Sequence, residues 1–400
     1  MAVFAIEDST LQLEWARLPT TDMTIEVGDR SFAVGAAPPE WYRLKLDRKP
    51  VRGSAGPGAL LIEGLDPDTT YDVWLSGREF PRRLVATART LSVPPGRLLA
   101  RFATISDCHI GEFRLGPLGR LHDPRPRPED LAPYPIRCAR AAIVEAEAWG
   151  AELLVVKGDL TREAAVKETA DVADVLETAS IPVHVTLGNH DVRGPADVAA
   201  VLAARGIAVG NEARAVDIGG VRLVLGHSPV PGLHSGRLDA DHVKDLVALA
   251  AAAPGPVILV LHHPLRRWPV STYYPPAISW KDSSLLVSGL AGSGQTALVL
   301  AGHTHRNRRY PVGGLPVAEV GSTKDYPGQW AGYAIYEGGV RQVVRRIARP
   351  DVISWTEMTK RAIGGIWGMW SPGSLSDRCW TLDWPSGVAS PTEDPPKSGN

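Results

Sequence analysis

Residues 297–305 read Ala297-Leu-Val-Leu-Ala-Gly-His-Thr-His305, an apolar run that is followed at once by two histidines. A short apolar run of this kind is typical of a buried strand. Four more apolar runs lead into polar motifs in the same way, at Ala103–His109, Leu153–Asp159, Val183–Asp191 and Val257–Pro264. In an open α/β sheet, ligands collect at the carboxyl ends of the strands. The five motifs are therefore expected to meet in one crevice, although they are far apart in the sequence.

Segments with helical spacing separate these strands. They are Ile136–Trp149, Arg162–Thr178, Pro195–Ala204 and Asp239–Ala252, the last with Asp239 as its N-cap. Further strands are expected at Leu98–Ile105, Val221–Leu225, Val317–Val320 and Ala331–Tyr336. Alternating strands and helices predict a layered α/β domain.

The first 93 residues have a different rhythm, with short alternating runs such as Tyr71, Val73 and Leu75 that predict β-strands. Leu65-Asp-Pro-Asp-Thr-Thr-Tyr71 has the pattern L-x-P-x-T-x-Y and resembles the tyrosine corner of fibronectin type III domains. We therefore expect a small fibronectin III-like all-β sandwich over residues 1–93. Pro94-Pro-Gly96 marks the boundary to an α/β domain over residues 94–348.

The last part of the chain, residues 349–400, is predicted to be a separate appendage and tail. Five of the twelve tryptophans fall between Trp355 and Trp384, a density that favours a packed segment. The residues from Pro385 to Asn400 are rich in proline, serine and glycine, which predicts disorder.

Composition excludes several classes of protein. The chain has 400 residues, so two domains are expected. Its formal net charge of −1 gives no indication of a nucleic-acid partner. No apolar run is long enough to span a membrane, and the first residues contain acids where a signal peptide needs bases. Only three cysteines occur, and they form no pairing pattern, which agrees with a reducing environment. We therefore expect the protein to be located in the cytoplasm.

The five motifs carry seven groups that can bind metal ions. They are four imidazoles, two carboxylates and one amide oxygen, from His109, His262, His303, His305, Asp107, Asp159 and Asn189. If one carboxylate bridges, these groups supply four bonds to each of two metal ions. Mixed nitrogen and oxygen ligands suit zinc, manganese or iron, and the sequence does not choose among the three.

The ordered set DxH, GD, GNHD, HHP and GHTH resembles the calcineurin-like metallophosphoesterases, over roughly residues 98–348. The resemblance implies two mixed sheets flanked by helices and a pair of divalent or trivalent metal ions that activate water for attack on phosphorus. It assigns the ligands as follows: one ion to Asp107, His109 and His305, the other to Asn189, His262 and His303, with Asp159 as the bridge. It also implies that His190 donates to the leaving oxygen and that Asp191 orients His190.

Departures from the family pattern narrow the expected activity. Arg162 stands where purple acid phosphatases carry a tyrosine, and the GDxVDRG motif of Ser/Thr protein phosphatases is absent. Gly158-Asp-Leu-Thr161 with Gly188-Asn-His-Asp191 looks most like the class III cyclic-nucleotide phosphodiesterases. We therefore expect a phosphodiesterase acting on a small phosphorylated substrate.

Two alternative functions stay open, and so does the role of two arginines. One is a phosphomonoesterase or pyrophosphohydrolase that uses the same two metals. Another is a non-catalytic scaffold that binds an unknown protein partner through the N-terminal domain. For Arg162 and Arg193, two interpretations remain, which are contact with phosphate through the guanidinium group and simple solvation.

Overall fold

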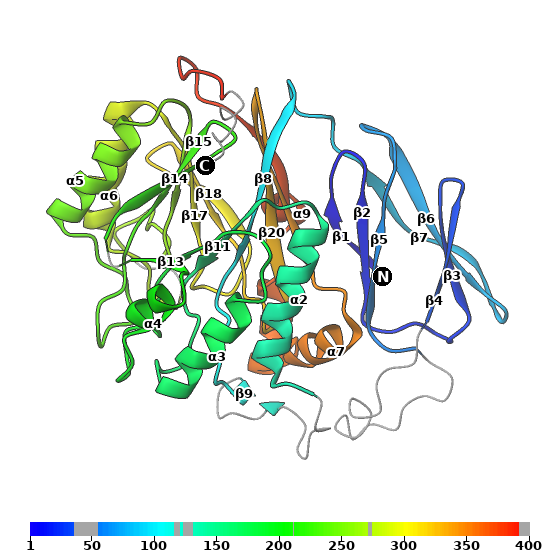
Figure 1. The fold of residues 1–400 in the computed structure, drawn as a ribbon. Coiled ribbons are helices and arrows are strands. Elements are labelled where there is room, and N and C mark those ends of the chain that lie inside the picture. Colours follow the sequence, from blue (N-terminus) through cyan, green and yellow to red (C-terminus); the bar gives the residue numbers. More distant parts are fainter. Residues whose placement is uncertain (36–54, 116–120, 123–130, 211, 271–273, 392–400) are drawn as a thin grey trace.

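The computed structural model describes residues 1–35, 55–115, 121–122, 131–210, 212–270 and 274–391. Part of the predicted disordered tail, residues 392–400, therefore lies outside the described residues. The described chain forms an N-terminal sandwich that packs beside two large sheets and their helices (Figure 1).

The N-terminal sandwich consists of two antiparallel sheets, with strand orders β1-β2-β5 and β4-β3-β6-β7. Its strands are β1 (Ala2–Ile6), β2 (Leu11–Trp15), β3 (Met23–Val27), β4 (Arg30–Val34), β5 (Gly58–Ile62), β6 (Thr70–Gly77) and β7 (Phe80–Arg89). The backbone N–H of Asp66 donates to the hydroxyl of Tyr71 at 2.9 Å, as in a tyrosine corner. The predicted all-β region is confirmed, and the fibronectin III-like domain over residues 1–93 stays a prediction.

The first large sheet has seven strands in the order β13-β12-β11-β8-β20-β21-β22. The first four run parallel and the last three antiparallel, so the sheet is mixed. Its strands are β8 (Leu98–Ile105), β11 (Leu153–Lys157), β12 (Val183–Thr186), β13 (Ala208–Val209), β20 (Gln329–Tyr336), β21 (Gly339–Arg346) and β22 (Cys379–Asp383). A separate short hairpin joins β9 (Arg114–Leu115) and β10 (Leu121–His122).

The second large sheet has six strands in the order β14-β15-β16-β17-β19-β18, with β14 and β18 antiparallel to their neighbours. Its strands are β14 (Arg214–Ile218), β15 (Val221–Leu225), β16 (Val257–Val260), β17 (Thr296–Ala301), β18 (Arg308–Val312) and β19 (Leu315–Glu319). Two mixed sheets between helices confirm the predicted fold class.

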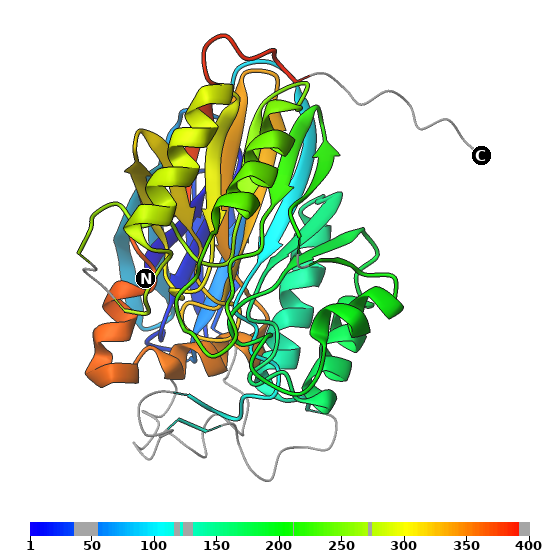
Figure 2. The ribbon, with the colours of Figure 1, turned by 90° about the vertical axis from the view of Figure 1, so that its left-hand side faces the viewer.

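Helices cover the outer faces of both sheets (Figure 2). The seven-stranded sheet is covered by α2 (Tyr134–Ala148), α3 (Val166–Leu176), α4 (Val198–Ala204) and α7 (Pro350–Thr359). The six-stranded sheet is covered by α5 (Ala240–Ala251) and α6 (Trp280–Ser293). Short helical turns follow α7, namely η2 (Ala362–Gly365), α8 (Ile366–Trp370) and α9 (Leu375–Arg378).

Alternation along each strand builds this layered core. In β11, Leu153 and Val155 face the core between the sheets, whereas Leu154 and Val156 face the helices. Each central strand therefore buries both of its faces, which explains why its sequence is an uninterrupted apolar run.

One predicted helix needs correction, and one helix was not predicted. Helix α3 begins at Val166 instead of Arg162, because residues 159–165 form a loop in which Asp159 and Ala164 have positive φ. The carboxylate of Glu168 caps the new start by accepting from the backbone N–H groups of Glu163 and Ala165. Helix α6 was not predicted, because its glycines and serines weaken the helical pattern, although Ser279 caps it by accepting from the N–H of Asp282.

Buried arginines on β21 connect the N-terminal sandwich to the seven-stranded sheet. Arg345 pairs with Glu7 of the segment after β1, and Arg346 pairs with Glu14 of β2 at 2.6 Å. The apolar core is also continuous from the sandwich into β8, β20 and β21. The sandwich is therefore docked against the sheet that carries part of the site.

The tryptophan-rich segment takes part in the same sheet. Strand β22 pairs with β21, and the side chain of Trp355 in α7 is fully buried against Tyr134, with ring centroids 3.9 Å apart. The segments after residue 348 therefore pack closely against the α/β core. The domain boundary at residue 348 stays a prediction.

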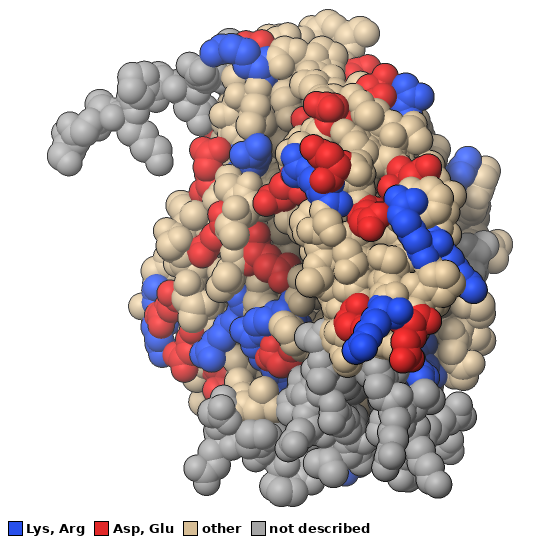
Figure 3. All heavy atoms as spheres, turned by 90° about the vertical axis from the view of Figure 1, so that its right-hand side faces the viewer, with Lys and Arg blue, Asp and Glu red and all other residues tan. Residues whose placement is uncertain are grey.

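Charges of both signs are interspersed on the described outer face of the sandwich (Figure 3). Some pair directly, such as Arg82 with Glu26 at 2.7 Å and Arg89 with Asp68 at 2.9 Å. Such exposed pairs contribute little to stability. None of the helices in the described ranges has the length and apolar character that crossing a bilayer requires.

Candidate metal centre

The five motifs occupy the loops after β8, β11, β12, β16 and β17, at the carboxyl ends of parallel strands. Five of the predicted ligands have positive φ, a backbone conformation that is uncommon for residues other than glycine and that clusters at functional sites. They are Asp107, His109, Asp159, His303 and His305, with φ between 45° and 69°. The chain therefore turns sharply at each strand end and directs these side chains inward.

Asp107, His109 and His305 form what we call the first cluster. The Nε2 atoms of His109 and His305 lie 3.1 Å apart, and Nε2 of His305 lies 3.5 Å from Oδ1 of Asp107. The carboxylate of Asp107 also accepts from the backbone N–H of His303 at 3.1 Å and from the hydroxyl of Ser106. Asp107 is fully buried, so the loops fix its position.

Asn189, His262 and His303 form the second cluster. Nε2 of His262 lies 3.3 Å from Oδ1 of Asn189 and 3.2 Å from Nδ1 of His303. All three side chains are buried.

Asp159 lies between the two clusters. Its Oδ2 is 3.4 Å from Nε2 of His262 and 3.7 Å from Nε2 of His109. Its Oδ1 accepts from the backbone N–H of His190 at 2.8 Å. The structure thus brings all seven predicted ligands together, with Asp159 at the position expected of a bridging carboxylate.

The hydrogen bonds of the histidines indicate which ring nitrogens carry lone pairs. Nδ1 of His262 donates to the carbonyl oxygen of Lys157 at 2.7 Å, and Nε2 of His303 donates to that of Pro276 at 3.1 Å. The other nitrogen of each ring therefore has a lone pair when the ring is neutral. These two lone-pair nitrogens lie 3.2 Å apart, and Nε2 of His262 also faces the oxygens of Asn189 and Asp159.

When His262 and His303 are neutral, these groups form a set of converging acceptors, which fits a cation. Ligand atoms that bind one metal at about 2.1 Å lie about 3.0–3.5 Å from one another. The distances of 3.1–3.5 Å within each cluster match this spacing. Zinc, manganese and iron all accept such nitrogen and oxygen ligands.

Charges within the site shift the pKa values of its histidines in opposite directions. Burial opposes a charge on His262, but the carboxylate of Asp159 outweighs it and raises the pKa to about 9. Burial and the neighbouring imidazole of His262 lower the pKa of His303 to about 3. A proton on His262 thus occupies the place of a cation, and metal binding would displace it.

His190 and Asp191 follow Asn189, but their side chains have different surroundings. Nδ1 of His190 donates to the carbonyl oxygen of Arg162 at 2.6 Å. The carboxylate of Asp191 instead accepts from the backbone N–H groups of Leu160, Thr161 and Gly188 and from the hydroxyl of Thr161.

The expectation that Asp191 orients His190 is therefore corrected. The Asp191 carboxylate holds the loops after β11 and β12 together, and the carbonyl of Arg162 takes the orienting position beside the imidazole. The physical reason is that a buried carboxylate is satisfied best by several N–H donors, and two loop backbones supply them.

A family model described as calcineurin-like phosphoesterase matches residues 100–307, just over half of the chain. This range contains all seven clustered ligands. The chain belongs to the calcineurin-like phosphoesterase family. Family membership and the His/Asp clusters together support a metal-dependent phosphoester hydrolase with a binuclear metal site.

Solved structures that resemble this phosphoesterase do so at low identity. A dimetal phosphatase from Danio rerio has 14% identity and a TM-score of 0.49, with 63% of this chain and 97% of that chain covered. A purple acid phosphatase from yellow lupin seeds has 12% identity and a TM-score of 0.44, with 88% and 73% covered. PhoD has 11% identity and a TM-score of 0.44, with 99% and 92% covered. A comparison with curated proteins gives no match.

Sequence reasoning missed one important residue of the phosphoesterase site, Asp325. Its Oδ2 accepts from Nδ1 of His305 at 2.7 Å and lies 3.3 Å from Nζ of the buried Lys324. Lys324 also pairs with Glu112 at 3.1 Å. Asp325 follows β19, a strand that was predicted as Val317–Val320, so the rule of strand carboxyl ends could have found it.

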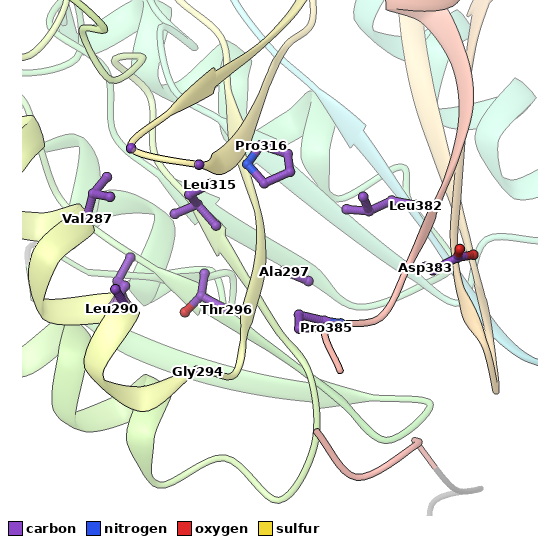
Figure 4. Close-up of a pocket in the computed structure, with 13 residues that line it drawn as sticks. Val287, Leu290, Gly294, Thr296, Ala297, Leu315, Pro316, Leu382, Asp383 and Pro385 are labelled. Atoms are coloured by element: carbon purple, nitrogen blue, oxygen red, sulfur yellow. The ribbon is translucent and has the colours of Figure 1, made fainter. Parts of the chain in front are cut away.

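A separate hollow of about 320 Å³ lies away from the histidines, between α6, β19 and the segment after β22 (Figure 4). It is lined mainly by apolar side chains, such as Leu290, Leu315 and Leu382. The residues that line it include none of the seven clustered ligands, so we assign the phosphoesterase activity to the clusters and not to this hollow.

Proposed function

We propose that this chain is a phosphodiesterase that works with two metal ions drawn from manganese, iron and zinc. One ion would be held by Asp107, His109 and His305, the other by Asn189, His262 and His303, and both by Asp159. When bound, the ions would activate a water molecule for in-line attack and neutralise oxygens of the phosphate. The observation that carries this proposal is the convergence of these lone-pair nitrogens and oxygens at 3.1–3.7 Å.

His190 is the residue that we propose acts on the leaving group. A ring nitrogen of His190 lies within 4.8 Å of ligand atoms of His109 and Asp159. Because Nδ1 donates to the carbonyl of Arg162, the proton for a leaving oxygen must be on Nε2. The imidazolium form of His190 would stabilise or protonate the departing alkoxide.

The preference for a diester is supported by the loops after β11 and β12. Gly158-Asp-Leu-Thr161 and Gly188-Asn-His-Asp191 resemble the class III cyclic-nucleotide phosphodiesterases, and Arg162 takes the place of a purple-phosphatase tyrosine. A small phosphorylated molecule is the proposed substrate.

A phosphomonoesterase or pyrophosphohydrolase is the second candidate. It is favoured by the guanidinium group of Arg193, which adds positive charge beside His190, with Nη1 3.3 Å from Nδ1 of the imidazole. A non-catalytic scaffold is disfavoured, because all seven ligand side chains are present and lie together.

Metal content and turnover test this function together. Purified protein would be analysed for metals and assayed with bis(4-nitrophenyl) phosphate and 4-nitrophenyl phosphate, before and after chelation and Mn²⁺ addition. We expect close to two ions per chain, faster turnover of the diester, loss of turnover with chelator and recovery with Mn²⁺. Faster turnover of the monoester would favour the second candidate. Fewer than one ion per chain after reconstitution, with no turnover, would refute a metallophosphoesterase.

Two further proposals concern the rest of the molecule. Sheets of three and four antiparallel strands with a tyrosine corner support a fibronectin III-like domain at the N-terminus. The three cysteines are buried and free, which supports the reducing environment of the cytoplasm.

A further inference from the structure

Arg193 lies two residues after Asp191, in the loop that carries His190. One end of its guanidinium group, Nη1, is 3.3 Å from Nδ1 of His190, in a partly buried position. The other end, Nη2, donates to Nδ1 of His234 at 2.7 Å, at the surface. Arg193 therefore bridges the loop after β12 and the loop after β15, at the rim of the metal centre.

The positive charge of Arg193 is not compensated within the described chain. Its contacts there are with two imidazoles, and no carboxylate of a described residue lies within ion-pair distance. His234 accepts from the guanidinium through Nδ1 and is therefore neutral, so it positions Arg193 without cancelling its charge. Nδ1 of His190 donates to the Arg162 carbonyl and only lies beside the guanidinium. A guanidinium has five N–H donors in a planar fork that suits phosphate and carboxylate oxygens.

The loop that carries Arg193 is held by several contacts to the neighbouring loop. Asp191 ties it to the loop after β11 through three hydrogen bonds, and the backbone N–H of Ala196 donates to the carbonyl of Ala164 at 3.0 Å. A side chain at Gly194 would collide with the carbonyl oxygen of Glu163, so the loop packs closely there. A group on such a loop loses little freedom when it binds a ligand.

Arg193 is in contact with His190, the residue that we propose acts on the leaving group. Its Nη1 is beside Nδ1 of His190, the nitrogen that is bound to the Arg162 carbonyl. The other nitrogen, Nε2, is the one proposed to act on the leaving oxygen. Within the described residues, Arg193 contacts His190 and His234 and none of the seven clustered ligands, so we place an anion bound there on the leaving group and not on the phosphorus that is attacked.

We propose that Arg193 is a specificity-determining residue that binds an anionic oxygen on the leaving group, and that His234 is its positioning residue. This inference rests on the proposed two-metal phosphoester hydrolase and, within it, favours the second candidate: it names substrates whose leaving group carries its own negative charge, such as an organic phosphate. Hydrolysis of such a substrate adds water across one P–O bond, and the leaving phosphate departs with the electron pair and takes up a proton.

The test compares two substrates that differ in the leaving group. Bis(4-nitrophenyl) phosphate releases nitrophenol, which has no anionic substituent, whereas P¹,P²-diphenyl diphosphate releases phenyl phosphate. The measured quantity is the ratio of kcat/KM for the diphosphate to kcat/KM for the diester. In the Arg193→Gln variant we expect this ratio to fall about 10- to 100-fold, mainly through KM of the diphosphate, with two metal ions retained.

Three more variants make the test specific. Arg193→Lys should recover part of the ratio, because it restores the charge without the planar fork. His234→Ala should lower the ratio less than Arg193→Gln, and His234→Asn should recover it, because an amide oxygen can replace Nδ1 as acceptor. Arg205→Gln is the matched control, since Arg205 is an exposed arginine that pairs with Glu177 at 2.7 Å away from the site. It should leave the ratio unchanged.

Failures of the two proposals look different. If the wild-type protein turns over neither substrate with two metals bound, the phosphoester function itself is wrong. If the wild type hydrolyses the diester but not the diphosphate, or if Arg193→Gln lowers both rates equally, the anion-binding role of Arg193 is refuted and the function stands.

Discussion

The two halves of the metal centre hold their histidines in different ways. In the first cluster, Nδ1 of His305 donates to the carboxylate of Asp325 at 2.7 Å. In the second cluster, His262 and His303 donate to backbone carbonyls at 2.7 and 3.1 Å. A carboxylate partner makes an imidazole a stronger metal ligand than a neutral carbonyl does.

The ligands themselves differ in the same direction. The first cluster contains the carboxylate of Asp107, whereas the second has the neutral amide of Asn189 in the corresponding role. We therefore expect the first cluster to bind its ion more tightly and to accept the ion of higher charge. The comparison shows that one set of motifs can form two sites of different metal affinity. The affinity depends on the charge of the ligands and on the hydrogen-bond partners of the ligating histidines.

The largest effect is expected from Asp159→Ala, which removes the group that both clusters share. Without the bridging carboxylate, both ions should be lost, and kcat/KM for bis(4-nitrophenyl) phosphate should fall at least about a thousandfold. Metal analysis and a turnover assay measure this. Asp174→Ala, which removes a half-exposed surface carboxylate, is the matched control. Retention of two ions in Asp159→Ala would contradict the bridging position.

His190→Ala should leave both clusters loaded, since His190 belongs to neither. Its kcat should fall about 100- to 1000-fold. Burial lowers the pKa of His190 below its ordinary value of 6.5, and only the imidazolium can donate from Nε2 while Nδ1 is bound to Arg162. The wild-type kcat should therefore fall as the pH rises through this lowered pKa. A variant that keeps the same pH profile as the wild type would exclude His190 as the acid.

Asp325→Asn tests directly whether the two clusters differ in metal affinity. An amide at this position cannot support His305 as strongly, so affinity for one ion should weaken about 10- to 100-fold while the other ion is unaffected. Lys324 keeps its pairing with Glu112, so the change is local. Competition with a chelator, followed by metal analysis, should show one equivalent lost early. Equal weakening of both ions would show that the clusters do not act separately.

The smallest effect is expected from Asp191→Asn, which should change stability more than metal binding. An amide offers one acceptor oxygen, so N–H donors of the two loops lose their partner at a cost of about 1–3 kcal/mol each. This corresponds to a fall in Tm of several degrees, which calorimetry of the metal-free protein can measure. Loss of both metal ions without a change in Tm would contradict this role.

The same variant should change the pH dependence of stability. Burial and then the Asp159 carboxylate raise the pKa of Asp191 to about 6, above its ordinary value of 3.8. The protonated carboxyl of Asp191 therefore stabilises the folded protein. This contribution to the free energy of unfolding is fully present below about pH 4 and is lost as the pH rises through about 6. This contribution to the Tm of the metal-free wild type should be missing in Asp191→Asn. An identical pH dependence in both proteins would refute it.

Asp191 and Asp325 show how far the sequence could lead. Asp191 is next to His190 in the chain, and this proximity suggested a partnership, but its carboxylate turns toward the backbone of two loops. Asp325 is twenty residues from His305 and nevertheless holds its imidazole. Contacts between neighbouring loops depend on how the strands pair, and local sequence patterns do not predict that pairing.

The sequence by itself determined the layered α/β fold, the β-rich N-terminus and the set of residues that converge in the site. Period-2 and period-3.6 patterns specify the elements, and a motif after a parallel strand must lie at the carboxyl edge of its sheet. Only the tertiary structure decided which carboxylate or carbonyl supports each histidine, and how Arg346 and Glu14 join the sandwich to the sheet. These partners come from distant segments, and side chains so far apart in sequence are brought within hydrogen-bonding distance only by packing.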